Sequence, residues 1–217
     1  MHGILTDGTP GALTYGAILA GGRSVRFGSP KAFARVGGLP LIERVLRCHR
    51  VALPESVIVT NEPSVYAALG ASVICDLHPH SGPLAGLHAA LIWASEKGVA
   101  GVCCTPCDAP FVHPELLRRL ALASVGMEAV LPRSDGPLGY EPQFGWYSVA
   151  VLPVVAACLS TGHLAFWQLV EQLGTIGYIS TAEVREFTSP ALVFSNVNTL
   201  DDLAIAQKQA ELVDDAG

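Results

Sequence analysis

Short apolar runs alternate with segments of helical periodicity along most of the chain. Continuous runs of Val, Ile and Leu with the length of a buried strand predict strands at Tyr15–Leu19, Ser56–Thr60, Ser72–Cys75, Ala100–Thr105, Ala129–Pro132 and Leu192–Ser195. Helices are predicted at Leu41–Arg50, Pro63–Leu69, Leu84–Glu96, Pro114–Ala123 and Leu200–Val213. Because the strands are apolar throughout and alternate with helices, the pattern indicates a mainly parallel sheet that is covered on both faces.

We therefore predict an α/β fold of the three-layer, Rossmann-like kind, with a mostly parallel twisted sheet and helices on both faces. Residues 15–213 are expected to form a single domain. Residues 1–14 carry Gly, Thr, Asp and Pro without a basic or long apolar stretch, so they predict a flexible tail rather than a signal peptide. Ligands of such sheets bind at the carboxyl ends of the strands, which makes the residues after each strand the first candidates for a site.

The segment after Pro132 has a different character. Residues 133–139 are polar and glycine-rich, and Glu141–Ala150 is strand-like with aromatic residues. We expect this part to form a hairpin or an added flap that borders the ligand crevice. It is the stretch best placed to recognise whatever part of a ligand the loops at the strand ends do not bind.

Composition narrows the class of protein. The chain has 217 residues, of which 50% are hydrophobic and 15% charged, so it can bury a large core and is not expected to be disordered. A net charge of −6 argues against a general nucleic-acid-binding surface. No stretch approaches 18 uninterrupted apolar residues, so no membrane span is expected. Six cysteines, most of them in apolar runs, predict reduced and buried thiols in a cytoplasmic protein.

The first predicted strand leads into a glycine-rich, basic loop, LAGGRSVRFGSPK, over residues 19–31. Its glycines allow the backbone to turn sharply and to approach a ligand, and its cations stand out against the acidic background of the chain. These residues are Gly21, Gly22, Gly28, Arg23, Arg26 and Lys31. Clustered backbone N–H groups beside cations predict a polyphosphate site, although the loop matches neither the P-loop nor the dinucleotide fingerprint. An ordinary glycine turn with basic surface residues is the alternative.

Asp76 ends the third predicted strand, and the loop Gly82–Gly86 opens the helix that follows. This loop could bring backbone N–H and C=O groups to the edge of a base. The Asp76 carboxylate could accept two hydrogen bonds from the N1–H and the exocyclic amine of guanine, a donor pair that adenine and cytosine lack. The alternative for Asp76 is a helix cap or a turn residue.

Asp108 lies at the mouth of the apolar strand that precedes it. It is well placed to hold Mg²⁺, which proteins typically bind with one or two carboxylates plus substrate phosphates. A helix N-cap is the weaker alternative, because prolines delay the helix start to Pro114. Near the C-terminus, Asn198 could offer an amide oxygen to a cation, whereas Thr199 and Asp202 resemble a capping box.

Cys104 and Cys107 form a Cys-x-Pro-Cys motif that competes with the magnesium interpretation. Such a pair is typical of a redox dithiol or of half a zinc site. A second Cys/His pair at zinc spacing is missing from the sequence, so we favour cysteines of the core or of the site wall.

Together these motifs resemble the molybdenum cofactor guanylyltransferase (MobA) family. The matching pieces follow the family's order from residue 16 to about residue 205: Leu19–Gly22 with Ser24, Arg26, Gly28 and Lys31; Asp76 with Gly82–Gly86; Pro106–Pro110; and Asn196–Thr199. The resemblance implies a nucleotide-diphosphosugar-transferase-like fold and Mg²⁺-dependent transfer of GMP from GTP to molybdopterin, with release of pyrophosphate. The chain departs from the family's pattern at Phe27, Ser29-Pro30 and Leu200.

The resemblance also implies roles for individual residues. The nucleotide would be bound by Leu19, Ala20, Gly21, Gly22, Lys31, Asp76, Gly82, Gly86 and Asp108. Lys31, Arg26 and Asp108 would be catalytic, and Asp108 with Asn198 would hold Mg²⁺. Partners would be GTP, molybdopterin, other proteins of molybdenum cofactor biosynthesis and those that deliver the cofactor to apo-molybdoenzymes. Three alternatives stay open: another phosphorylated acceptor such as a sugar phosphate, cytidylyl transfer to the molybdenum cofactor, and a catalytically silent GTP-binding accessory module.

Overall fold

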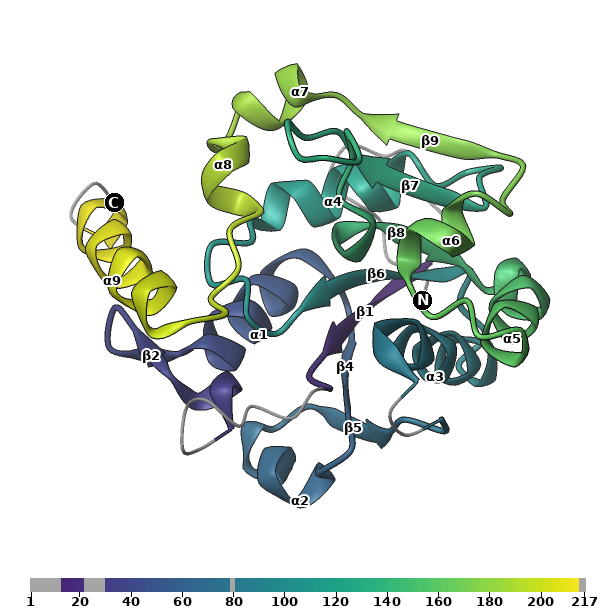
Figure 1. Ribbon diagram of the computed structural model, residues 1–217, viewed down its shortest axis with the longest axis horizontal. Coiled ribbons are helices and arrows are strands. Elements are labelled where there is room, and N and C mark those ends of the chain that lie inside the picture. Colours follow the sequence, from purple (N-terminus) through teal and green to yellow (C-terminus); the bar gives the residue numbers. More distant parts are fainter. Residues whose placement is uncertain (1–12, 22–29, 79–80, 215–217) are drawn as a thin grey trace.

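Seven strands form the central sheet: β1 (Thr14–Leu19), β4 (Ser56–Thr60), β5 (Ser72–Cys75), β6 (Gly101–Pro106), β7 (Ala129–Pro132), β8 (Trp146–Ser148) and β9 (Ile176–Ile179). The computed structural model describes residues 13–21, 30–78 and 81–214. The strand order is β5-β4-β1-β6-β8-β7-β9, from the bottom of the sheet to the top in Figure 1. All neighbouring strands are parallel except β8, which is antiparallel to both β6 and β7.

Four helices cover the two faces of the sheet: α1 (Leu41–Ala52), α3 (Gly82–Glu96), α4 (Pro114–Leu122) and α5 (Leu152–Ser160). Side chains alternate between these faces along each strand, as the pleat requires. On β1, Ile18 packs into the cluster that includes α1 and α4, whereas Leu19 packs into the cluster that includes α3 and α5. The result is a three-layer arrangement, which confirms the predicted fold class.

The smaller elements lie around this centre: β2 (Arg35–Val36), β3 (Leu39–Pro40), α2 (Pro63–Tyr66), α6 (Phe166–Val170), α7 (Thr181–Arg185), α8 (Pro190–Val193) and α9 (Leu200–Asp214). The short β2–β3 ribbon and α9 lie together at the periphery (Figure 1), where the N–H of Gly37 donates to Gln207 at 3.2 Å. Buried residues of this part, Val36 and Ala210 among them, form a third, small core. Within the described part of the chain, no helix is long and apolar enough to cross a membrane.

The predicted strands from Tyr15 to Pro132 agree with the structure to within one residue at each end, but the predicted strand Leu192–Ser195 is wrong. Pro190 begins a short helix, α8, in which the carbonyl of Ser189 accepts hydrogen bonds from Leu192 and Val193. Proline favours the first position of a helix, since the N–H that it lacks would be unpaired there. Val193 is buried by helical packing rather than by pairing with another strand.

The strand-like segment Glu141–Ala150 is only partly a strand. A short 3₁₀ helix occupies Pro142–Phe144, and only Trp146–Ser148 joins the sheet as β8. Pro142 has no N–H to donate to a strand ladder, which explains why pairing starts later. The antiparallel pairing of β7 with β8, together with a bridge between Arg133 and Tyr140, confirms that the segment folds back as a hairpin.

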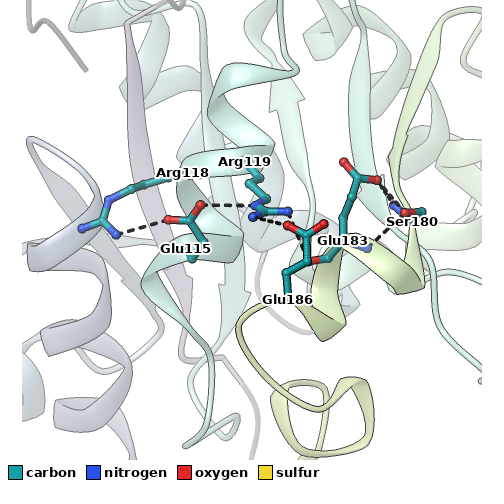
Figure 2. Close-up of polar contacts among 6 residues, drawn as sticks. All are labelled: Glu115, Arg118, Arg119, Ser180, Glu183 and Glu186. Atoms are coloured by element: carbon teal, nitrogen blue, oxygen red, sulfur yellow. Dashed lines mark hydrogen bonds and ion pairs between the residues drawn. The ribbon is translucent and has the colours of Figure 1, made fainter. Parts of the chain in front are cut away.

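A network of ion pairs joins α4 to the chain around α7 (Figure 2). Arg119 contacts Glu115 at 3.2 Å and Glu186 at 2.8 Å, and it donates to the carbonyl of Glu183 at 3.2 Å. Its guanidinium also lies over the ring of Phe187, 5.1 Å from the centroid. Arg119 therefore holds the segment after β9 against the helical layer.

Candidate nucleotide-binding site

Three strands of the sheet bring their carboxyl ends to one place. Leu19 of β1 is in register with Pro106 of β6, and its carbonyl accepts a hydrogen bond from the N–H of Cys107 at 3.0 Å. The N–H of Ala20 donates to the carbonyl of Val59 on β4 at 2.8 Å. The loops that follow β1, β4 and β6 therefore start side by side, as a doubly wound sheet requires for a ligand site.

Leu19 and Ala20 are both buried at this junction, and Gly21 is exposed. A Cβ built at Gly21 would meet no atom within 4 Å, so its identity is not set by packing among the described residues. Gly22 and Arg26, which were predicted to bind the nucleotide and to act in catalysis, lie outside the described residues.

The centre of the candidate site is the side chain of Lys31. Its Nζ lies 2.5 Å from Oδ2 of Asp108 and 3.0 Å from Oδ1 of Asn198. Lys31 and Asp108 expose only 18% and 15% of their side chains, so solvent screens this pair incompletely. Three residues from distant parts of the chain, each predicted from the sequence to belong to the site, thus meet at one point.

Backbone contacts fix the positions of these residues. The N–H of Val197 donates to the carbonyl of Asp108 at 2.9 Å, which ties the segment before α9 to the end of β6. Asp202 accepts the N–H groups of Asn198 and Thr199 at 2.9 and 2.8 Å, and the hydroxyl of Thr199 accepts the N–H of Asp202 at 3.1 Å. The predicted capping box is confirmed. The hydrogen bonds lower the pKa of Asp202, most of all the one from the backbone of Asn198.

The carboxylate of Asp108 does not cap a helix. His113 caps α4 instead, because its Nδ1 accepts the N–H of Glu115 at 3.2 Å. Asp108 and Asn198 therefore direct a carboxylate and an amide oxygen at one cationic atom. Hard oxygen donors of this kind suit Mg²⁺. The part of the chain that the structure describes holds no group of three or more His, Cys, Asp or Glu residues that could bind a metal.

Asp76 follows β5 and the Gly82–Gly86 segment opens α3; β4 and β1 lie between β5 and β6 in the sheet. Oδ1 of Asp76 accepts the N–H of His78 at 2.8 Å, so the alternative of a turn residue describes at least part of its role. Gly82 is exposed at the start of α3 with φ of +71°, a value that favours glycine. Gly86 is buried, and a Cβ there would lie 3.1 Å from Leu19 Cδ2, which gives it a packing role between α3 and β1.

Cys104 and Cys107, the cysteines near the site, are buried thiols of low reactivity. All six cysteines are free, and all except Cys75 are buried. Burial raises the pKa of the Cys104 thiol, and burial together with the charge of Asp108 raises the pKa of Cys107 to about 12. Both thiols therefore stay protonated near neutral pH and are poor nucleophiles or metal ligands. The structure favours the interpretation that they are core and wall residues.

A cavity of about 450 Å³ adjoins the site, and residues 164–167 of its lining were not expected from the sequence. It is bordered by the start of α3, the hairpin residues 138–144, the segment 164–167 and Asn196. The hairpin had been expected to border the crevice, and Leu138, Glu141 and Gln143 do so. No motif pointed to Trp167, since α6 is short and has no sequence signature.

Comparison with known proteins finds similar chains over most of this sequence. Residues 16–176 match the family model described as the MobA-like NTP transferase domain. The chain is 34% identical over 199 residues to the probable molybdenum cofactor guanylyltransferase of Pelotomaculum thermopropionicum, with 90% of this chain and 93% of that protein covered. It is also 34% identical over 195 residues to the molybdenum cofactor guanylyltransferase of Cereibacter sphaeroides, with 89% and 95% covered.

Solved structures show the same fold. The molybdopterin-guanine dinucleotide biosynthesis protein A of Archaeoglobus fulgidus superposes with a TM-score of 0.75 at 28% identity, and the match covers 92% of this chain and 99% of that one. The 2-C-methyl-D-erythritol 4-phosphate cytidylyltransferase of Thermus thermophilus superposes with a TM-score of 0.64 at 21% identity, covering 90% and 98%. The second likeness concerns the fold alone.

Proposed function

The chain belongs to the MobA-like NTP transferase family, and from this membership we propose that it transfers GMP from GTP to the phosphate of the molybdenum cofactor, with release of pyrophosphate. The observation that carries the proposal is the meeting of Lys31, Asp108 and Asn198 beside the buried end of β1. A lysine and paired oxygens at strand ends are the groups that a triphosphate with its metal ion needs. The names of the curated relatives supply the choice of GTP and of the acceptor.

The reaction is an in-line transfer at the α-phosphate of GTP. An oxygen of the acceptor's phosphate forms a bond to the α-phosphorus, while the bond from this phosphorus to the bridging oxygen of the β-phosphate breaks. That oxygen leaves with its electron pair as part of pyrophosphate. Because the attacking phosphate is already an anion, no strong general base is required, and catalysis consists of positioning and neutralisation of charge.

Different residues of the site supply the positioning and the neutralisation of charge. Lys31 neutralises charge on the GTP phosphates, and the backbone N–H groups of the loop after Leu19 orient them. Asp108, with Asn198 beside it, would hold Mg²⁺ through oxygen ligands. When bound, the ion offsets the negative charge that the triphosphate and the acceptor phosphate bring together. We assign Arg26 of the glycine-rich loop to the same phosphates.

We assign the selection of the base to Asp76 and to the start of α3. The Asp76 carboxylate accepts from the N1–H and the 2-amino group of guanine, and the exposed start of α3 at Gly82 offers backbone groups to the base edge. Delivery of the product to apo-molybdoenzymes would need partner proteins. The six free cysteines suit a reducing compartment, and we place the protein in the cytoplasm on this ground.

The proposal is tested with the purified protein, Mg²⁺ and molybdenum cofactor, with GTP, CTP, ATP or ITP supplied in separate reactions. Pyrophosphate release and the mass of the dinucleotide product are measured. We expect both when GTP and the acceptor are present together, a slower reaction with ITP because it lacks the 2-amino group, and neither product with CTP or ATP. A preference for CTP would assign the chain to cytidylyl transfer, and GTP binding without pyrophosphate from any acceptor would assign it to a silent accessory role; either result refutes the proposal.

A further inference from the structure

Arg44 of α1 contacts two segments of the chain that lead to the candidate site. Its Nη1 donates to the carbonyl of Val36 at 3.1 Å, and its Nε donates to the carbonyl of Pro110 at 3.3 Å. Val36 lies five residues after Lys31. Pro110 lies two residues after Asp108. One guanidinium therefore joins the segment that carries the lysine to the segment that carries the carboxylate.

The chain between Lys31 and Val36 is short and held by hydrogen bonds. The carbonyl of Lys31 accepts the N–H of Ala34 at 2.9 Å, which closes the 3₁₀ helix Lys31–Phe33. The carbonyl of Ala34 in turn accepts the N–H of Leu41, the first residue of α1, at 2.9 Å. Val36 and Leu41 are fully buried in the third, small core. Because this stretch has little slack, the place of the Val36 carbonyl affects the place of the Lys31 backbone.

The loop after β6 is held in a similar way. The carbonyl of Asp108 accepts the N–H of Val197, and the carbonyl of Pro110 accepts from Arg44. The next residue, Phe111, is buried in the same third core as Val36 and Leu41. The guanidinium lies over the ring of Phe111, 5.6 Å from its centroid, which is within the range of a cation–π contact. The ring and the two carbonyls together restrict the position of the guanidinium.

The shape of the arginine side chain matters for this connection. A guanidinium is planar and carries its N–H donors in a fixed fork, so two carbonyl oxygens bound to it are held at a fixed separation. A lysine has its three donors on one nitrogen at the end of a flexible stem and cannot reproduce this arrangement. Arg44 is also half-buried, so water competes less for the two carbonyls than it would at the surface.

The contact that depends on this connection is a short one. Nζ of Lys31 lies 2.5 Å from Oδ2 of Asp108, so a small displacement of either segment separates the two groups. Misplacement of catalytic groups by about 1 Å can lower a rate about 100-fold, even when its origin is far from the chemistry. A residue of α1 that joins the two segments can therefore control the rate through the backbone.

We propose that Arg44 is a positioning residue for GMP transfer, which sets the contact between Lys31 and Asp108 by holding two backbone carbonyls at a fixed separation. The inference rests on the proposed function, because that function assigns the GTP phosphates to Lys31 and the metal ion to Asp108. It adds a residue of α1 that the motifs in the sequence do not include.

The kinetic test compares Arg44→Met and Arg44→Lys with the unaltered protein. Met keeps the apolar part of the side chain without its donors, and Lys keeps the charge without the fork. Arg47→Met is the matched control, because Arg47 lies on the exposed side of the same helix, where it contacts Glu43 at 3.0 Å. The Tm of each variant is measured first, so that every rate refers to folded protein.

Arg44→Met should lower the single-turnover rate of GMP transfer about 20-fold or more, while the Kd for GTP stays within about threefold. Arg44→Lys should keep a Tm near that of the unaltered protein and still lose about fivefold or more in rate. Arg47→Met should change neither quantity. A rate within about threefold of the original in folded Arg44→Met would overturn the inference, and so would full recovery of the rate in Arg44→Lys.

A labelling test without substrates separates this inference from the proposed function. The lysines of the chain are Lys31, Lys97 and Lys208, of which the last two are exposed and serve as internal references for an amine-acylating reagent. Relative to them, acylation of Lys31, followed by mass spectrometry, should be about fivefold faster in Arg44→Met and unchanged in Arg47→Met. Unchanged acylation of Lys31 in Arg44→Met overturns the inference even if the enzyme is active. Faster acylation in a protein that makes no dinucleotide refutes the proposed function and supports the positional role of Arg44.

Discussion

Replacement of His49 tests whether a buried, neutral histidine couples the stability of this fold to pH. His49 belongs to α1 and is fully buried beneath the sheet. Its Nε2 lies 2.8 Å from the hydroxyl of Thr105 on β6, and its Nδ1 lies 3.2 Å from the hydroxyl of Ser56 on β4. Burial lowers the pKa of His49 to about 3, so the folded protein keeps the ring neutral.

The direction and the size of the change in stability with pH follow from the pKa of His49. A histidine in the unfolded chain has a pKa of about 6.5, so below that pH the unfolded state binds a proton that the folded state excludes. Stability is therefore lost as the pH falls through about 6.5, and the loss continues down to the folded pKa of about 3. Between pH 7.5 and 5.0 the loss from this single group is about 2 kcal/mol.

The assay is urea denaturation of the unaltered protein and of His49→Gln at both pH values. Gln stays uncharged at either pH, and the other titratable groups contribute equally to both proteins. We expect the free energy of unfolding of the unaltered protein to fall by about 2 kcal/mol more than that of the variant. Equal losses in the two proteins would mean that His49 is protonated in the folded state, and would refute its description as a neutral bridge.

Three further predictions concern packing and thiol chemistry. Arg119→Met removes the ion pairs of Arg119 with Glu115 and Glu186 (Figure 2) and should lower Tm by about 2–4 °C, or about 1 kcal/mol; an unchanged Tm would show that these two pairs contribute nothing. Gly16→Ala places a Cβ 2.2 Å from His49 Nδ1 and should lower the free energy of unfolding by about 1–3 kcal/mol, whereas Gly21→Ala should leave it unchanged; equal stability of the two variants would contradict the packing described. Iodoacetamide should modify Cys75 in the native protein and the five buried cysteines only after unfolding, as mass spectrometry would show; native labelling of a buried cysteine would refute its assignment.

The central strands could be predicted because a strand that is buried on both faces consists of consecutive apolar residues. β4, for example, is buried at every position and was located without error at Ser56–Thr60. The chain between β8 and α9 was harder to predict. Its helices α6, α7 and α8 have only four or five residues, and the half-buried edge strand β9 is recognisable mainly through its pairing with β7, a tertiary contact.

The site could be predicted as far as the topology determines it. Lys31 and Asp108 are separated by 77 residues, but a parallel sheet brings the loops at its carboxyl ends together whatever the spacing. The different positions of Asn196 and Asn198 could not be predicted, because two asparagines in one short loop carry the same chemistry. Only the contacts of the folded chain direct Asn198 toward Lys31 and leave the oxygen of Asn196 buried without a partner.

The most direct test of the account is the rate of GMP transfer by Asp108→Asn at saturating GTP and molybdenum cofactor, measured in a single turnover beside the Kd for GTP. Glu96→Gln, at the far end of α3, is the matched control for loss of one negative charge. The account predicts a rate at least 100-fold lower for Asp108→Asn, a Kd within a few-fold of the original, and no change for Glu96→Gln. A rate within threefold of the unaltered protein would show that Asp108 is not part of the catalytic centre.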